Sequence, residues 1–435
     1  MSAKRDLPRN YELTIDRLSH EGRGVGRYEG KTVFVADALP GEQVAVKVTR
    51  RHRRFDEAVA TAVLKPDPTR VTPRCAHAAQ CGGCSLQHLD SAAQIAHKQA
   101  VLLELLQHQA GVTPDNVLAP VVGPQWGYRR RARLSVRVVP KKGGVLIGFR
   151  EKATHYVTDI DTCAVLIPSV GEILPVLRKV ISALSVVAHI PQIEVASDGT
   201  TTILIIRHLA PLNDSDRQQL AAFESATGLA VYLQASSAVM LEPLTGVAPL
   251  GYCVDDLAFA FEPGDFIQVN AEINVALVAL ALDALQLDAG DSVLDLFCGL
   301  GNFTLPIAKR ARHVVGVESD SGLLARAHAN AERNAIRNVE FVATDLFADA
   351  GIAKLAARSF QKVLLDPPRT GAHQLLRTLD LNATSRVVYV SCNPVTLARD
   401  TSILVRERGF RLCTAGVIDM FPHTAHVESI AVFER

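Results

Sequence analysis

The stretch S-V-L-D-L-F-C-G-L-G-N-F, residues 292–303, joins a short apolar run to a turn with two glycines. Similar apolar runs follow it, with helical sequence between them, at residues 313–318, 338–343, 362–366 and 386–391. Buried parallel strands have continuous apolar sequence, and strands that alternate with helices form a parallel sheet. The chain is therefore predicted to form a doubly wound α/β domain from about residue 270.

Four acidic side chains and one thiol lie near the ends of these predicted strands: Asp295, Glu318, Asp345, Asp366 and Cys392. Ligands of such sheets bind at the carboxyl ends of the strands, where an acidic residue such as Glu318 commonly accepts hydrogen bonds from ribose hydroxyls. Thr304 stands where a dinucleotide fingerprint has its third glycine. A single nucleoside such as S-adenosylmethionine is therefore favoured over a dinucleotide.

Cys392 lies in S-C-N-P, residues 391–394. Asn393 suits an N-cap and Pro394 the first helical position, so a helix is expected to begin directly after the thiol. The partial positive charge of a helix start lowers the pKa of a thiol, which makes Cys392 a candidate nucleophile. For an isolated cysteine the alternative is a small core residue at the end of a strand.

Carbon 5 of uracil becomes nucleophilic when a thiolate adds to carbon 6, and a base must then remove the carbon-5 proton. Glu428, in H-V-E-S, is the candidate base because residues 426–433 have strand-like sequence that could return beside Cys392. An ordinary strand glutamate is the alternative. In L-D-P-P-R, residues 365–369, an arginine follows the prolines instead of an aromatic residue, which disfavours amine methylation and leaves carbon methylation open.

Three of the eight cysteines, Cys75, Cys81 and Cys84, lie close together in C-A-H-A-A-Q-C-G-G-C. Residues 1–10 lack the apolar core of a signal peptide and no apolar run is long enough for a membrane span, so a cytoplasmic protein is expected. Clustered cysteines in that compartment indicate a metal site rather than disulfides. Cys163 is the leading candidate for the fourth ligand, and His77 or His88 could replace it in a zinc site. The spacing of these residues does not decide between a zinc ion and an iron–sulfur cluster.

The net charge is only +1, but residues 1–74 carry 15 Lys and Arg against 10 Asp and Glu, and residues 125–152 carry 9 against 1. Two basic segments favour a nucleic-acid partner. Short alternating strands over residues 11–64 predict a small β-barrel, a fold that often binds oligonucleotides, and Arg50, Arg51, Arg53 and Arg54 support that function. Tyr128 and the arginines up to Arg133 are expected to form a second surface for a nucleic-acid strand.

We therefore expect an α/β protein of three parts. Residues 1–70 form an OB-like RNA-binding barrel, residues 71–265 a mixed central domain with the cysteine site, and residues 266–435 a Rossmann-like methyltransferase domain. The helical segment of residues 91–124 is expected to pack on the catalytic domain.

The ordered motifs C-x5-C-x2-C, D-T-C, F-I-Q-V-N, D-L-F-C-G-L-G-N-F, L-D-P-P-R, S-C-N-P and H-V-E-S span essentially the whole chain. In this order they resemble the bacterial 23S rRNA uracil-C5 methyltransferases that carry an N-terminal TRAM domain and an iron–sulfur cluster. The resemblance implies a [4Fe-4S] cluster on Cys75, Cys81, Cys84 and Cys163, with Cys392 as nucleophile and Glu428 as base. It also implies S-adenosyl-L-methionine as cofactor, surrounded by Gln268, Phe297, Asn302, Glu318, Asp345 and Asp366.

The resemblance further implies 23S ribosomal RNA as partner. We also expect no membrane association, because no apolar run is long enough, and a monomer. Related tRNA enzymes are expected to lack the barrel and the cluster, which favours rRNA, but another rRNA site or tRNA is the alternative substrate. An iron–sulfur oxidoreductase would need a second redox cofactor, and an RNA-binding protein without activity would not need a helix-capped cysteine opposite a glutamate.

Overall fold

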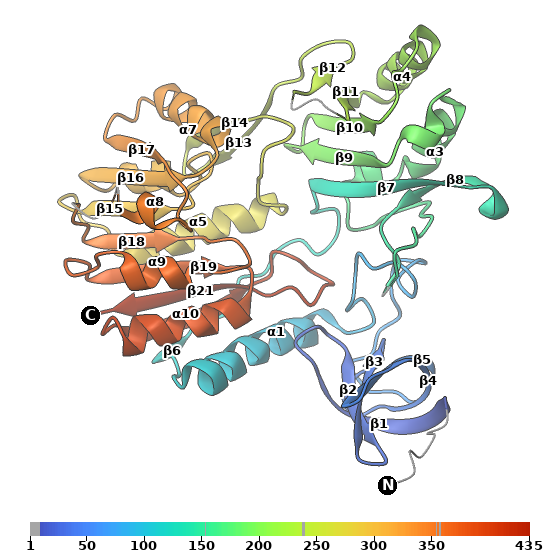
Figure 1. Cartoon of the computed structure of the whole chain (residues 1–435), viewed down its shortest axis with the longest axis horizontal. Coiled ribbons are helices and arrows are strands. Elements are labelled where there is room, and N and C mark those ends of the chain that lie inside the picture. The colour runs from blue at the N-terminus through green and yellow to red at the C-terminus, as the bar shows by residue number, and fades with distance from the viewer. Residues whose placement is uncertain (1–8, 153, 237–239, 354, 356–357) are drawn as a thin grey trace.

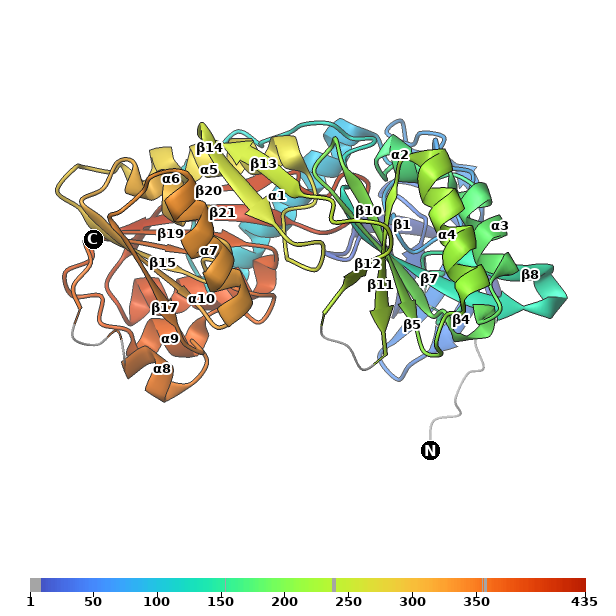
Figure 2. The same cartoon turned by 90° about the horizontal axis from the view of Figure 1, so that it is seen from above.

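The computed structural model describes residues 9–152, 154–236, 240–353, 355 and 358–435. Residues 1–8, on which most of the signal-peptide expectation depends, lie outside the described residues. Figure 1 shows an N-terminal barrel in blue, a central sheet in green and a C-terminal α/β part in yellow to red. Seen from above in Figure 2, the C-terminal part lies beside the other two.

The N-terminal part is a closed five-stranded barrel with the strand order β1-β2-β3-β5-β4. Its strands are β1 (Asn10–Leu18), β2 (Gly24–Tyr28), β3 (Lys31–Ala36), β4 (Gln43–Arg51) and β5 (Phe55–Lys65). Alternate residues such as Ile15, Val33 and Val44 are buried inside it, as the alternating sequence requires. The predicted barrel is confirmed.

The central part is a six-stranded sheet in the order β12-β11-β10-β9-β7-β8. The strands are β7 (Arg131–Val139), β8 (Gly144–Gly148), β9 (Gln192–Ser197), β10 (Thr202–His208), β11 (Ala230–Ala235) and β12 (Glu242–Pro243). Two helices, α3 (Leu174–Ala183) and α4 (Asp214–Thr227), share one apolar core with this sheet. The short helix α2 (Pro168–Gly171) precedes α3 and follows Cys163.

The C-terminal part contains an eight-stranded sheet in the order β17-β16-β15-β18-β19-β21-β20-β6. Its strands are β6 (Asn116–Val117), β15 (Ser292–Leu296), β16 (His313–Glu318), β17 (Val339–Ala343), β18 (Lys362–Leu365), β19 (Arg386–Ser391), β20 (Arg411–Ile418) and β21 (Glu428–Glu434). The strands β15 to β19 are parallel, whereas β21 runs antiparallel to β19 and β20. The predicted doubly wound sheet is confirmed.

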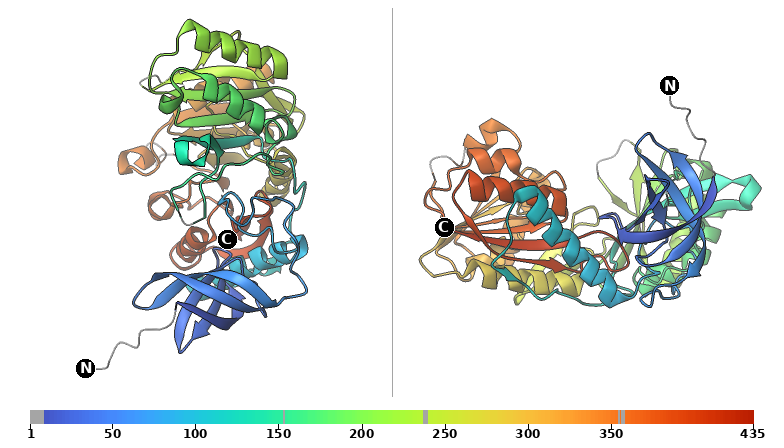
Figure 3. Two further views of the ribbon diagram at one scale, coloured as in Figure 1. Left: turned by 90° about the vertical axis from the view of Figure 1, so that its right-hand side faces the viewer. Right: turned by 90° about the horizontal axis from the view of Figure 1, so that it is seen from below.

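Helices cover both faces of this sheet, and each face has its own apolar core. One face packs against α5 (Ala271–Leu285), α6 (Thr304–Ala308) and α7 (Ser321–Arg333). The other packs against α8 (Asp349–Ala353), α9 (His373–Thr378), α10 (Pro394–Arg406) and, from far earlier in the chain, α1 (Ser91–Leu105). Figure 3 shows α1 lying along the C-terminal part, which is the packing expected for the helical segment.

Two segments of the predicted central domain thus belong structurally to the C-terminal part. Strand β6 is the edge strand of its sheet. The hairpin of β13 (Leu250–Val254) and β14 (Leu257–Phe261) contributes Leu250, Phe259 and Phe261 to the core beneath α5 and α7. A chain can leave one domain and return to it. A single boundary at residue 265 therefore assigns the β13–β14 hairpin to the central domain, although it packs in the C-terminal core.

Among the helices of the described residues, none is long and apolar enough to cross a membrane.

Candidate functional site

A cavity of about 530 Å³ opens at the carboxyl ends of β15 to β19. Seven of the predicted site residues line it: Gln268, Phe297, Glu318, Asp345, Asp366, Cys392 and Glu428. They come from sequence positions up to 160 residues apart, and the parallel sheet brings them together because successive strands end at the same edge. The cavity is large enough for a small molecule together with a nucleobase.

The glycine-rich turn after β15 forms one wall of this cavity. Phe297 has a φ of 65° and Gly299 a φ of 55°, both in the left-handed region. The Gly299 N–H donates to Glu318 Oε2 at 3.2 Å, while the Ser319 and Asp320 N–H groups donate to Oε1 at 2.7 and 3.1 Å. The Glu318 carboxylate is therefore held in place, and the strained Phe297 backbone is of the kind that proteins retain at functional sites.

Asn302 is the one predicted cofactor residue that does not line the cavity. Its amide exchanges two hydrogen bonds of 3.0 Å with Asn274 on α5 and accepts a third from the Tyr252 hydroxyl. These contacts tie the glycine-rich turn to α5 and to the β13–β14 hairpin.

Cys392 directly follows β19, and Glu428 begins the neighbouring antiparallel strand β21. Ser391 is paired with Ser429 in the β19–β21 ladder, so Cys392 and Glu428 occupy the next register position just beyond this pair. Helix α10 begins at Pro394, and its N-cap Asn393 accepts a hydrogen bond from the Val395 N–H. The predicted return of the H-V-E-S strand beside Cys392 and the predicted helix start are both confirmed.

The electrostatics of Cys392 differ from the prediction. Burial, reinforced by the negative charges of Glu428 and Asp366, raises the pKa of the Cys392 thiol to about 11, and Arg369 opposes the shift. Burial also raises the pKa of Asp366 to about 7 and that of Glu428 well above its usual range. The expectation of a lowered thiol pKa was wrong for the protein alone, because burial and two carboxyl groups outweigh the helix start.

Several lining residues were not predicted as site residues: Phe266, Phe347, Arg369, Phe421 and His426. The Arg369 guanidinium donates to His426 Nδ1 at 3.3 Å, beside Cys392 and Glu428. Phe266 and Phe347 expose 65% and 48% of their surface, which is unusual for aromatic residues. The sequence signal for these two residues was their position, since Phe266 lies two residues before Gln268 and Phe347 two residues after Asp345.

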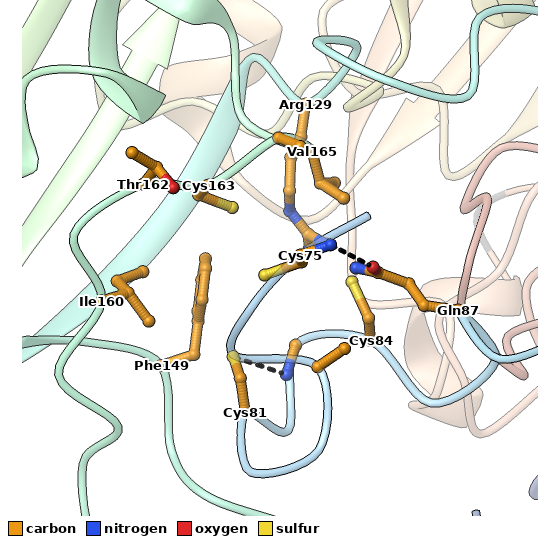
Figure 4. Close-up of a pocket in the computed structure, with 13 residues that line it drawn as sticks. Cys75, Cys81, Cys84, Gln87, Arg129, Phe149, Ile160, Thr162, Cys163 and Val165 are labelled. Carbon is orange, nitrogen blue, oxygen red and sulfur yellow. Dashed lines mark hydrogen bonds between the residues drawn. The ribbon is translucent and has the colours of Figure 1, made fainter. Parts of the chain in front are cut away.

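A second pocket is lined by all four predicted metal-site cysteines, Cys75, Cys81, Cys84 and Cys163. Figure 4 shows their sulfur atoms around a common space, with Phe149 and Ile160 alongside. The Gly83 N–H donates to the Cys81 sulfur at 3.4 Å. A side chain at Gly82 would bring its Cβ within 2.8 Å of the Arg150 carbonyl oxygen, so the tight cysteine loop requires this glycine.

Within the described part of the chain, no three His, Cys, Asp or Glu side chains are arranged to hold a single metal ion. Zinc bound by four thiolates at about 2.3 Å requires sulfur atoms closely grouped around one point. The four thiols line one pocket, and no three of them are arranged as ligands of a single ion. His77 and His88, the possible substitute ligands, do not line the pocket.

The second predicted nucleic-acid surface is only partly exposed. Tyr128 and Arg130 are buried, at 6% and 3% exposure. The Tyr128 hydroxyl donates to the Pro422 carbonyl oxygen at 3.1 Å, and Arg130 Nε donates to the Gln268 carbonyl oxygen at 2.9 Å. These two residues join the central part to the cavity wall, so the prediction that they form a surface was wrong. The barrel arginines Arg50, Arg53 and Arg54 are exposed, as is Arg133.

The chain is similar to known RNA methyltransferases. The family model described as tRNA (Uracil-5-)-methyltransferase matches residues 92–435, and the TRAM domain model matches residues 8–61. A protein of Alkalilimnicola ehrlichii named 23S rRNA (uracil(1939)-C(5))-methyltransferase RlmD is 50% identical, over 99% of this chain and 98% of its own. A protein of the same name from Stenotrophomonas maltophilia is 50% identical over 98% of this chain and 97% of its own.

Among solved structures, the tRNA (uracil-54, C5)-methyltransferase of Pyrococcus abyssi, in complex with S-adenosyl-L-homocysteine, is similar over 97% of this chain and all of its own. The two share 26% identity with a TM-score of 0.75. The predicted methyltransferase fold and the N-terminal TRAM domain are thereby confirmed. This chain belongs to the tRNA (uracil-5-)-methyltransferase family, the enzymes that methylate carbon 5 of uracil in RNA.

Proposed function

We propose that this protein methylates carbon 5 of a specific uridine in 23S rRNA, with S-adenosyl-L-methionine as methyl donor and through a covalent bond from Cys392 to carbon 6. The observation that carries the proposal is the pairing of β19 with β21, which sets Cys392 beside Glu428 in one cavity. Uracil-C5 methylation needs a thiol nucleophile and a base at the same ring.

The choice of RNA rests on the relatives. Two bacterial proteins named for uracil 1939 of 23S rRNA are 50% identical to this chain over nearly their full length. The archaeal protein named for tRNA uracil 54 is 26% identical. Its similarity over 97% of this chain extends into the barrel, so a barrel alone does not separate rRNA enzymes from tRNA enzymes. On the higher identity we favour 23S rRNA, and tRNA is the second candidate.

The cavity offers a complete set of groups for S-adenosylmethionine. Glu318 suits the ribose hydroxyls because its carboxylate is fixed at the end of β16, and Asp345 and Phe297 suit the adenine. Gln268 and Asp366 line the remaining part of the cavity, and Asn302 supports the glycine-rich turn from behind. When bound, the donor supplies an electrophilic methyl group on a positively charged sulfur.

The protein's own groups carry out the rest of the reaction. The Cys392 thiolate adds to carbon 6 of the uracil, and the electrons pass to carbon 5, which takes up the methyl group. Glu428 then removes the carbon-5 proton, the ring double bond re-forms and the thiolate is expelled. A carboxylate whose pKa is raised is the stronger base, and burial gives Glu428 that property. Arg369 favours the thiolate because its charge lowers the pKa of Cys392.

We further propose that Cys75, Cys81, Cys84 and Cys163 hold a [4Fe-4S] cluster. The support is that the distant Cys163 lines one pocket together with the three thiols of the cysteine loop. No three of these thiols are arranged to hold a single ion. A cluster held by four thiolates fills such a space.

The direct test is transfer of a labelled methyl group to 23S rRNA that lacks the modification, with tRNA tested in parallel. RNA with 5-fluorouridine at the methylated position should form a protein–RNA adduct that survives denaturation, since fluorine cannot be removed as a proton. Methylation of ordinary RNA without any adduct to the fluorinated RNA would exclude thiol addition.

Two variants separate the steps. Cys392→Ala should abolish both methylation and the adduct while S-adenosylmethionine still binds. Glu428→Gln should form the adduct with ordinary RNA and fail to release it, because an amide cannot take up the proton. A Glu428→Gln variant that turns over normally would exclude this residue as the base.

A further inference from the structure

The β20–β21 loop, residues 419–427, forms part of the wall of the catalytic cavity. Its side chains Phe421 and His426 line the cavity, and Glu428 follows the loop directly. The position of this loop therefore affects the shape of the space around Cys392.

The loop is hydrogen-bonded to the segment that follows the cysteine loop. The N–H groups of Ser85 and Leu86 both donate to the His423 carbonyl oxygen, at 3.0 and 2.9 Å. The Ala425 N–H donates to the Ser85 hydroxyl oxygen at 2.9 Å. Ser85 is the residue after Cys84, so it connects the cysteine loop directly to the β20–β21 loop.

Helix α1 supplies two more anchors, both buried. Lys98 Nζ donates to Asp419 Oδ1 at 2.6 Å and to the Phe421 carbonyl oxygen at 3.0 Å. Gln94 Oε1 accepts from the His423 N–H at 2.9 Å. Polar groups of the loop are thus satisfied by residues that precede them by more than 320 positions in the chain.

The loop conformation depends on these contacts. His423 has a φ of 65°, a backbone conformation that side-chain-bearing residues rarely adopt. Its ring stacks on Trp126 with a centroid distance of 3.8 Å. A strained residue persists only where its surroundings hold it, so weaker contacts should let the loop relax.

We propose that Ser85 is a positioning residue for methyl transfer, holding the β20–β21 loop so that Phe421 and His426 are placed correctly against the target uridine. The inference rests on the proposed function at Cys392. Among the residues that the structure describes, none lines both the cysteine pocket and the catalytic cavity. Ser85 nevertheless makes the geometry of the cavity depend on the cysteine loop.

The test is Ser85→Ala in the full-length, metal-loaded protein. This change removes the acceptor for the Ala425 N–H, and the value of one hydrogen bond predicts a decrease of about two- to tenfold in kcat/KM for RNA. Metal content and the affinity for S-adenosylmethionine should not change. Ser85→Thr, which keeps the hydroxyl, should restore activity.

Ser169→Ala is the matched control, because Ser169 follows Cys163 by six positions in the chain and bonds to Thr202 Oγ1 at 3.2 Å rather than to the loop. Two measurements report on the loop itself in Ser85→Ala. Hydrogen exchange should rise in residues 419–427 but not in α7, and the emission of Trp126, the only tryptophan, should change because its partner His423 moves.

Parent-like kinetics and exchange in Ser85→Ala would overturn the proposal. An equal rise of exchange in α7 would also overturn it, because the variant would then be generally destabilised. If the parent protein formed no adduct with 5-fluorouridine RNA, the proposed function would fail instead, and this outcome is visible in the parent protein without any Ser85 variant.

Discussion

Cys392 should react slowly with alkylating reagents in the free protein. Its pKa is raised from the ordinary 9.0 to about 11, so the thiolate fraction at pH 8 falls from about 10% to about 0.1%. A thiolate of higher pKa is intrinsically more nucleophilic, which with a Brønsted coefficient of about 0.5 restores roughly tenfold of the rate. The net expectation is alkylation about tenfold slower than that of an ordinary thiol.

The assay is labelling by iodoacetamide between pH 7 and about 9.5, with the peptide that contains Cys392 quantified by mass spectrometry and a short cysteine peptide as reference. Because this range lies below a pKa of about 11, the rate should rise about tenfold per pH unit without levelling. A rate that bends away from this slope at about pH 9 would show an unshifted thiol and refute the reasoning.

Two substitutions test the assigned causes at about pH 9, where Asp366, with a pKa of about 7, is ionised. Asp366→Asn should speed the labelling, by less than the roughly fivefold that removal of the whole shift would give at this pH once the lower nucleophilicity of the resulting thiolate is included. Arg369→Gln should slow it, since Arg369 lowers the pKa of Cys392. Asp380→Asn, at an exposed position, is the control. Changes in the same direction for both variants would mean that the cavity had opened and that charge was not the cause.

Protein purified without air should be brown and contain about four irons per chain, and the Cys163→Ser variant should contain less iron. Stoichiometric zinc without inorganic sulfide would contradict the proposed cluster. The double variant Arg51→Ala, Arg54→Ala should bind RNA more weakly, and the slope of log affinity against log salt concentration should fall by about one to two. The control Arg333→Ala, on α7, should change neither quantity. If the double variant bound RNA as tightly as the parent at every salt concentration, this barrel surface would be excluded as an RNA contact. Lys98→Met should lower the free energy of unfolding by about 3–5 kcal/mol, because it leaves Asp419 buried without its partner. Chemical denaturation measures this loss, and a variant as stable as the parent would contradict it.

Much of the fold was predictable because its signals are local. The continuous apolar runs of β15 to β19 identified buried parallel strands, and Asn393 with Pro394 identified the start of α10. Strand ends in a parallel sheet meet at one edge. For this reason Glu318, Asp366 and Cys392 could be assigned to one site from the order of the strands alone.

The cysteine site and the domain boundaries were predictable only in part. The loop with Cys75, Cys81 and Cys84 was recognised from its spacing, but the approach of Cys163 depends on how the central part packs on that loop. Strand β6 joins the C-terminal sheet through pairing with β20, and no local pattern records such a long-range pairing.

The ionisation of Cys392 and the anchoring of the β20–β21 loop depend on tertiary packing. The pKa of a thiol reflects burial and charges that arrive from Asp366 and Glu428, which are neighbours in space and not in the chain. In the same way, Ser85 and Lys98 bind loop residues that follow them by more than 300 positions. Residue type and spacing therefore indicate which groups take part in the chemistry, whereas desolvation and long-range contacts set their pKa values and positions.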